Sequence, residues 1–159
     1  MGSRDSALTI RAAELSEMDE VRQLFREYQT ELDVDLCFQS FEEELDSLPG
    51  KYTLPKGQLL LGMVDGTVQG CVAFRSLDAG VCEMKRLFVR PAARSVGLGR
   101  ELVAEILSQA KSSGYESMVL DTLDRLHSAR LLYERAGFVE VPAYYENPLE
   151  GVIFLQRKL

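Results

Sequence analysis

The chain has 159 residues, of which 46% are hydrophobic, and a net charge of −7 at pH 7. This is the size of one ordinary domain with enough apolar material for a buried core, and the acidic balance argues against a general nucleic-acid binder. The longest apolar run, residues 59–64, is too short to cross a bilayer, and the 3 cysteines lack a C-x-x-C spacing. We therefore expect a single cytoplasmic domain over residues 1–159, with residues 1–7 as a flexible tail and no membrane or nucleic-acid partner.

Apolar periodicity and turn signals predict the secondary structure in chain order. An opening strand precedes two amphipathic helices, for which Ser16 and a Ser40–Glu43 capping box are the candidate N-caps. Three strands follow as a meander, with Asp65-Gly66 as its first turn. The predicted strands cover residues 8–12, 58–64, 67–77, 80–89, 117–121, 138–141 and 151–157, and the predicted helices cover residues 17–32, 41–48, 98–112 and 126–136.

This order of elements predicts the fold class. Hairpins pair their strands antiparallel, whereas strand–helix–strand crossovers require parallel pairing. We therefore expect an α/β (α+β) domain with a mixed, mostly antiparallel sheet of six to seven strands and about four flanking helices. The last strand, residues 151–157, is expected to be exposed and to offer an edge for pairing in a homodimer.

A basic, glycine-containing turn joins the strand over residues 80–89 to the helix over residues 98–112. Its residues are Arg94, Ser95, Val96, Gly97, Leu98, Gly99 and Arg100. The first N–H groups of a helix have no intrahelical partner and carry partial positive charge, and glycines let a ligand approach the backbone closely. The arginines add charge-assisted hydrogen bonds. Neither a Walker loop nor the G-x-G-x-x-G fingerprint fits, so the turn predicts a phosphate site of another kind.

The turn has the pattern R-x-x-G-x-G, and a later helix ends in L-Y-x-x-x-G-F at Gly137 and Phe138. Together these two motifs resemble the GNAT-type N-acetyltransferase superfamily. The resemblance implies acetyl-CoA as co-substrate, with its diphosphate at the turn, and no metal. The sequence departs from the family pattern at Leu126, where many members carry asparagine, and at Ser95, where glycine is usual.

The resemblance also implies where the pantetheine arm of the coenzyme binds. Two neighbouring strands of that fold splay apart, and here they would be residues 83–89 and 117–121. Splaying leaves main-chain groups unpaired, and such groups need partners. We expect these groups to be those of Leu87, Phe88 and Val89.

Two residues are candidates for proton transfer. Tyr133 matches the family position of the acid that protonates the departing thiolate, and a phenol with an ordinary pKa near 10 suits that role. The alternative is an aromatic ring that only packs between helix and sheet. Glu83 lies fourteen residues before Gly97, the spacing at which some members place a catalytic glutamate. Its alternative is a surface glutamate, or one paired with Lys85 or Arg86.

The acceptor site is expected between the last two strands. Tyr144 and Tyr145, beside Glu146, suit an amine through cation–π and charge contacts. Asn147 belongs to the same expected site, although Asn147-Pro148 equally fits an ordinary turn. Phe38 and Gln39 are expected to line the opposite side.

The sequence therefore predicts an N-acetyltransferase that moves an acetyl group from acetyl-CoA to a primary amine, of a small molecule or a peptide, by direct attack. A non-catalytic acetyl-CoA-binding sensor or interaction module of the same fold is the alternative.

Overall fold

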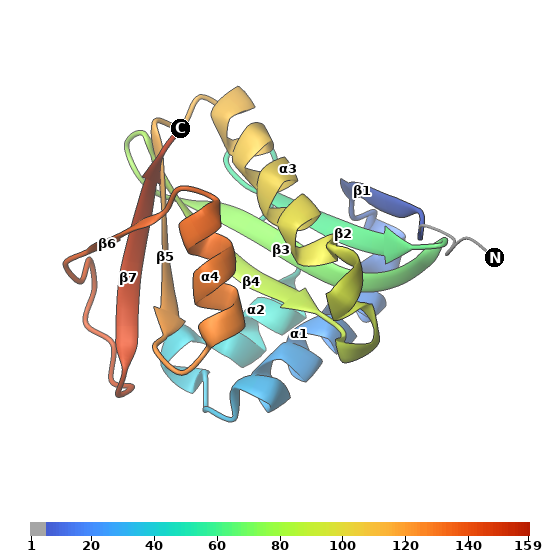
Figure 1. Cartoon of the computed structure of the whole chain (residues 1–159), viewed down its shortest axis with the longest axis horizontal. Coiled ribbons are helices and arrows are strands. Elements are labelled where there is room, and N and C mark those ends of the chain that lie inside the picture. The colour runs from blue at the N-terminus through green and yellow to red at the C-terminus, as the bar shows by residue number, and fades with distance from the viewer. Residues whose placement is uncertain (1–5) are drawn as a thin grey trace.

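The computed structural model describes residues 6–159, which form one seven-stranded sheet with helices on both faces (Figure 1). In Figure 1, α3 and α4 lie on the near face of the sheet, and α1 and α2 lie behind it. The strands are β1 (Leu8–Ala12), β2 (Gln58–Val64), β3 (Thr67–Asp78), β4 (Val81–Val89), β5 (Ser117–Leu123), β6 (Val139–Val141) and β7 (Val152–Lys158). The α-helices are α1 (Met18–Leu32), α2 (Phe41–Ser47), α3 (Leu98–Ser112) and α4 (His127–Arg135), and the 3-10 helices are η1 (Leu15–Glu17), η2 (Cys37–Gln39) and η3 (Pro91–Val96). The predicted fold class and element order are confirmed.

The sheet order is β1-β2-β3-β4-β5-β7-β6, and every neighbouring pair is antiparallel except β4 and β5, which are parallel. These two strands pair only at their starts, the last pair being Glu83 with Val119. Residues 84–89 of β4 have no partner on β5, so the strands diverge there, as predicted. This divergence opens the sheet at its centre.

A β-bulge in β4 decides which side chains face this opening. Cys71 of β3 pairs with Phe88, but Ala73 pairs with Lys85, so two residues of β4 oppose one of β3. Arg86, in the bulge, has a left-handed backbone with φ of 61°. The extra residue reverses the alternation of β4, so Arg86 and Lys85 both lie on the α2 side, while Leu87 packs toward α3.

Two apolar cores hold the helices to the sheet. The core on the α3 side includes Leu60, Val72, Phe74, Met84, Leu98, Leu102, Ile106 and Tyr133, and the core on the α1 side includes Val21, Leu24, Phe25, Phe41, Leu45, Leu61, Cys71 and Phe88. Helix α3 packs so closely on the sheet that a Cβ at Gly62 would come within 2.9 Å of Leu98 Cδ1, and glycine at this position permits the approach. Burial on both faces keeps the central strands, and therefore the diverging pair, in place.

Two predicted helix caps are wrong. Ser16 lies within η1, and Glu17 is the N-cap of α1, while Glu14 and Glu17 form a capping box around η1. Ser40 precedes α2 but makes no side-chain capping bond, because its backbone is left-handed (φ 55°) and not in the extended conformation that an N-cap residue needs to reach the first amides.

Two predictions about the ends of the chain also change. The last strand is not a sheet edge, because β7 lies between β5 and β6, so it gives the homodimer expectation no support. Of the predicted tail, residues 1–5 lie outside the described residues, whereas Ala7 is held by Asp65, whose Oδ1 accepts its N–H at 3.0 Å. No helix within residues 6–159 is long and apolar enough to span a membrane.

Candidate active site

The turn between β4 and α3 presents free main-chain donors. Gly97 is the N-cap of α3 with a left-handed φ of 87°, which disfavours any residue with a side chain, and no side chain caps the helix. The first amides of α3 are therefore left to water or to a ligand. A Cβ at Gly99 would meet only ordinary contacts, the nearest being Leu132 Cδ2 at 3.4 Å, so packing within the chain does not require glycine there.

The two arginines of the turn lie at its ends. Arg94 donates from Nε to the Val89 carbonyl at 2.9 Å and also pairs with Glu31 of α1, so it ties the turn to the end of β4. The Arg100 side chain is 78% exposed, with Glu101 3.8 Å away as a weak partner. The Arg100 side chain is therefore free to turn toward an anion, whereas the Arg94 side chain is already bound to the Val89 carbonyl and to Glu31. The phosphate contacts of both arginines stay predictions.

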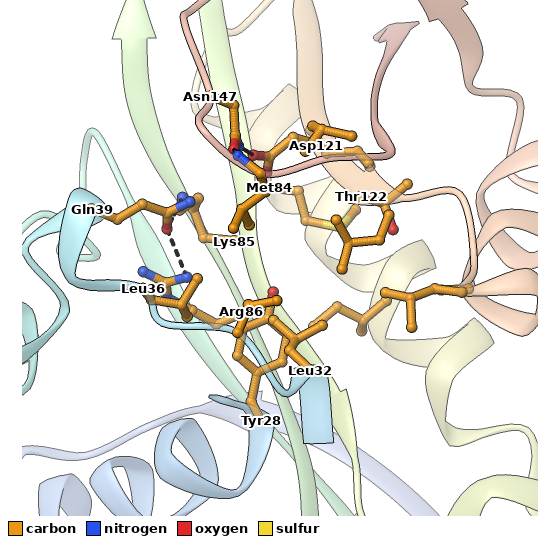
Figure 2. Close-up of a pocket in the computed structure, with 18 of the residues that line it drawn as sticks. Tyr28, Leu32, Leu36, Gln39, Met84, Lys85, Arg86, Asp121, Thr122 and Asn147 are labelled. Atoms are coloured by element: carbon orange, nitrogen blue, oxygen red, sulfur yellow. Dashed lines mark hydrogen bonds between the residues drawn. The ribbon is translucent and has the colours of Figure 1, made fainter. Parts of the chain in front are cut away.

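A narrow cavity of about 90 Å³ occupies the gap between the diverging strands. Its walls are formed by the segments of β4 and β5 that do not pair with each other, by the end of α1 and by α4. The lining residues include Tyr28, Leu32, Met84, Lys85, Leu87, Leu120, Asp121, Leu123, Leu126, Ala129, Tyr133 and Asn147 (Figure 2). The lining is mainly apolar with a few polar groups, which is typical of small-molecule sites. Leu87 lies on it, while Phe88 is turned into the core on the α1 side.

Tyr133 lies on this gap because of how α4 ends. Gly137 is left-handed (φ 94°), and the Phe138 N–H donates to the Tyr133 carbonyl at 3.0 Å. This is a Schellman motif, and it brings the rings of Phe138 and Tyr133 to 5.9 Å in an edge-to-face contact. The motif L-Y-x-x-x-G-F therefore fixes the tyrosine ring. Burial raises the pKa of Tyr133 above its ordinary value, so the phenol keeps its proton at neutral pH.

Glu83 is buried at the last position of β4 that pairs with β5, so the alternative of a surface glutamate is wrong. Its Oε1 accepts from Arg75 Nε at 2.9 Å, from the cross-strand neighbour on β3. Its Oε2 accepts from the Tyr144 hydroxyl at 2.5 Å. The expected partner Lys85 lies further away, with Nζ 3.9 Å from Oε1. Burial, followed by the charge of Glu83, raises the pKa of Tyr144, which keeps its hydroxyl a donor.

Arg86 forms a second buried ion pair, between β4 and α2. Its guanidinium binds Glu44 through Nε at 2.9 Å and Nη2 at 3.0 Å, and it lies 5.1 Å from the centre of the Phe41 ring. Gln39 accepts through Oε1 from both Arg86 and Lys85 at 3.0 Å (Figure 2). The bulge of β4 is thus held to η2 and α2 by charge-assisted hydrogen bonds.

Asp121 of β5 is a site residue that the sequence reasoning missed. It lies two residues past the last β4–β5 pair, and its Oδ2 accepts from the Tyr145 hydroxyl and, at 3.2 Å, from Asn147 Nδ2 (Figure 2). These bonds tie the β6–β7 loop to β5. The available signal was a single carboxylate within the otherwise mostly apolar strand SMVLDTL. Lys85 and Arg75 were also missed as site residues, whereas Gln39 was expected beside Phe38 and lines the cavity described next.

A second cavity, of about 380 Å³, lies beside the first. It is lined by η2 and α2, by β3 and β4, and by the β6–β7 loop. Phe38, Gln39, Glu43, Glu44, Lys51, Tyr52, Arg75, Glu83, Lys85, Arg86, Tyr144, Tyr145 and Glu146 line it. Of the expected site residues, Phe38, Glu83, Tyr144 and Tyr145 meet here, whereas Asn147 and Tyr133 line the gap. Gln39, Lys85 and Arg86 line both cavities, which therefore adjoin at these residues.

No metal site is apparent over residues 6–159, where no group of three or more His, Cys, Asp or Glu side chains is arranged to hold an ion.

The comparisons with known proteins agree with this geometry. The sequence matches the model of the acetyltransferase (GNAT) family over residues 18–138, and the chain belongs to this family. It is 40% identical over 159 residues to an uncharacterized N-acetyltransferase of Schizosaccharomyces pombe, with 98% of each chain covered.

Solved structures share the fold. A GNAT-family acetyltransferase from Staphylococcus aureus superposes with a TM-score of 0.80 at 21% identity, covering 96% of this chain and 99% of that one. The Salmonella typhimurium protein yncA, solved with its cofactor acetyl-CoA, superposes with a TM-score of 0.71 at 22% identity, covering 96% and 94%.

Proposed function

We propose that this protein is an N-acetyltransferase that moves an acetyl group from acetyl-CoA to a primary amine. Membership of the acetyltransferase (GNAT) family supports this reaction class. The observation that carries the proposal is the gap between β4 and β5. It adjoins the larger cavity at Lys85, it is lined by Tyr133, and β4 leads from it to the free amides of the turn.

The described residues fit the coenzyme. When bound, acetyl-CoA supplies a thioester whose acyl carbon accepts a nucleophile. The amides at the start of α3, around Leu98 and Gly99, would hold the diphosphate, with Arg100 free to join them. The unpaired edge of β4 over Leu87–Val89 would hydrogen-bond the pantetheine amides, since these groups have no partner on β5. Leu126 lies on the same wall, so an apolar contact replaces the side chain that the family pattern would place there.

Two side chains would move the protons. The nitrogen of the acceptor forms a bond to the acyl carbon, the bond from carbon to sulfur breaks, and the nitrogen loses a proton. Glu83, in the larger cavity, would take up that proton through a water molecule. Tyr133, which stays protonated at neutral pH, would donate a proton to the departing sulfur. The two groups are placed on the two cavities that adjoin, as a direct transfer requires.

Direct attack is supported by the state of the cysteines. Cys71 and Cys82 are fully buried, and burial raises the pKa of each thiol to about 12. Neither is a thiolate at neutral pH, and only the thiolate is a good nucleophile. Cys37 is exposed, and it lines neither cavity.

Thiol release from acetyl-CoA with a panel of amines, for the wild-type protein and Tyr133→Phe, tests the proposal. We expect kcat to fall about 100-fold in the variant, with coenzyme affinity unchanged, because only the hydroxyl is removed and the contact with Phe138 remains. If the wild-type protein binds acetyl-CoA but no amine releases thiol, the protein is a sensor of the coenzyme and the proposal fails.

A further inference from the structure

The Lys85 ammonium is a buried charge where the two cavities adjoin. Its side chain is only 10% exposed, and it lines both cavities. Nζ donates to Gln39 Oε1 at 3.0 Å, which is its single side-chain partner within hydrogen-bond distance among the described residues, and the Glu83 carboxylate lies 3.9 Å away. An ammonium has three donors, so two remain for a ligand.

The neighbouring cations do not share this property. Arg86 is bound through two nitrogens to Glu44, and Arg75 is bound to Glu83. Within each pair the two charges neutralise each other. Of the cations Arg75, Lys85 and Arg86, Lys85 is therefore the one whose donors are not used by a short ion pair. A buried ammonium with unused donors is costly unless an anion completes its shell.

We propose that Lys85 binds a carboxylate of the acceptor, and that the acceptor is an α-amino acid. This inference rests on the proposed acetyl transfer. In an α-amino acid the nitrogen and the nearer carboxylate oxygen are about 3 Å apart. Lys85 Nζ and Glu83 Oε1 are 3.9 Å apart, so one molecule can place its carboxylate against the ammonium and its amine toward Glu83.

The rest of the cavity fits this occupant. Glu83 lines the same cavity as Lys85, and Asp121 lines the adjoining gap, so the Lys85 ammonium lies close to carboxylates and the site can hold both charges of a zwitterion. Beyond the two charges, the cavity is walled by the aromatic side chains of Phe38, Tyr52 and Tyr144, which leave room for the side chain of the amino acid.

The test compares the standard α-amino acids that carry a primary amine and no thiol with their corresponding amides, measured by thiol release at saturating acetyl-CoA. Acid and amide share the amine and the side chain and differ in the negative charge. We expect the best acid to exceed its amide about 100-fold in kcat/KM, since a site built for a charged partner rejects the analogue that lacks it. In Lys85→Met this preference should fall to near parity, and in Lys85→Arg it should largely remain.

Lys51→Met is the matched control, because Lys51 lines the same cavity but is exposed. It should leave the preference unchanged. Amides that match or exceed the acids in the wild-type protein would overturn the inference and leave the acetyltransferase intact, and this comparison does not depend on whether a variant folds. Retained preference in a folded Lys85→Met would also overturn it. If acetyl-CoA binds and no acid or amide is acetylated, both this inference and the proposed transfer to amines of this kind fail.

Discussion

The proposed coenzyme half and the proposed acceptor half of the site are built by different physical means. The main-chain donors and acceptors of the coenzyme half come from one continuous stretch, from β4 through the turn into α3. The acceptor half is assembled from η2, α2, β3, β4 and the β6–β7 loop, and buried ion pairs hold it together. Backbone groups are present whatever the side chains are, whereas each ion pair needs its own partner. The coenzyme half should therefore be sensitive to substitutions that add charge or bulk. The acceptor half should be sensitive to substitutions that remove one member of an ion pair.

The largest effect is expected from Gly99→Glu in the coenzyme half. The added carboxylate would face the diphosphate, and we expect coenzyme A affinity to fall by at least about 100-fold. Folding should not suffer, because acidic residues are favoured in the first turn of a helix and a Cβ fits there. Calorimetric titration with coenzyme A and a thermal melt measure the two quantities. Ser108→Glu adds the same charge further along α3 and should bind normally. Wild-type affinity in Gly99→Glu would show that the turn does not hold the coenzyme.

The acceptor half is tested by Arg86→Met, which leaves the Glu44 carboxylate without its partner. The side chains of this pair are 2% and 19% exposed, so we expect a loss of about 3 kcal/mol in the free energy of unfolding. Arg26→Met is the matched control, since its pair with Glu42 also involves α2 but is 52% and 68% exposed and should cost less than about 1 kcal/mol. Urea denaturation compares them. Equal losses would show that the pair with Glu44 has no special role.

A smaller effect separates the two halves kinetically. Tyr144→Phe removes the hydroxyl that donates to Glu83 and loosens the loop over the acceptor cavity. We expect the KM for the acceptor to rise about 10-fold while coenzyme affinity stays the same. Tyr115→Phe is the control, because the Tyr115 hydroxyl donates to the Lys56 carbonyl, outside both cavities. A change in coenzyme affinity without a change in the KM for the acceptor would contradict the assignment of this loop to the acceptor half.

The smallest expected effect is a pH dependence of acceptor binding. Burial, followed by the charge of Arg86, lowers the pKa of Lys85 below 10.5, against the opposing charges of Glu83, Asp121 and Glu44. The ammonium exists below its pKa, so as the pH rises it loses its charge earlier than an ordinary lysine does. The KM for a carboxylate acceptor should therefore rise on the alkaline side. In Lys85→Arg, whose guanidinium stays charged, this rise should be absent, and its persistence would assign it to another group.

Much of the fold and of the backbone geometry of the turn was predictable, because the signals are local. The Asp65-Gly66 turn, the glycines of the turn before α3, and the Gly137-Phe138 ending of α4 each specify backbone geometry within a few residues. The order of elements then gives the sheet and its parallel pair, whereas the divergence of that pair was expected only from the family resemblance. The capping predictions failed where a preceding 3-10 turn changed the backbone, as at Ser40.

The acceptor half was only partly predictable. Glu83 was found from its spacing to Gly97 in the family pattern, but its pairing with Arg75 depends on the register of β3 and β4. That register, and the face on which Arg86 lies, depend on a bulge that no local motif announces. Asp121 acquires its role only because two side chains of a loop more than twenty residues later bind it.

A crystal structure of the protein with coenzyme A tests the central claim most directly. The account predicts the diphosphate on the amides of Leu98 and Gly99, the pantetheine arm between β4 and β5, and the sulfur within hydrogen-bond distance of the Tyr133 hydroxyl. Coenzyme bound elsewhere, such as in the groove of α3 and α4 lined by Arg100, Arg135 and Arg157, with the gap between the strands empty, would contradict it.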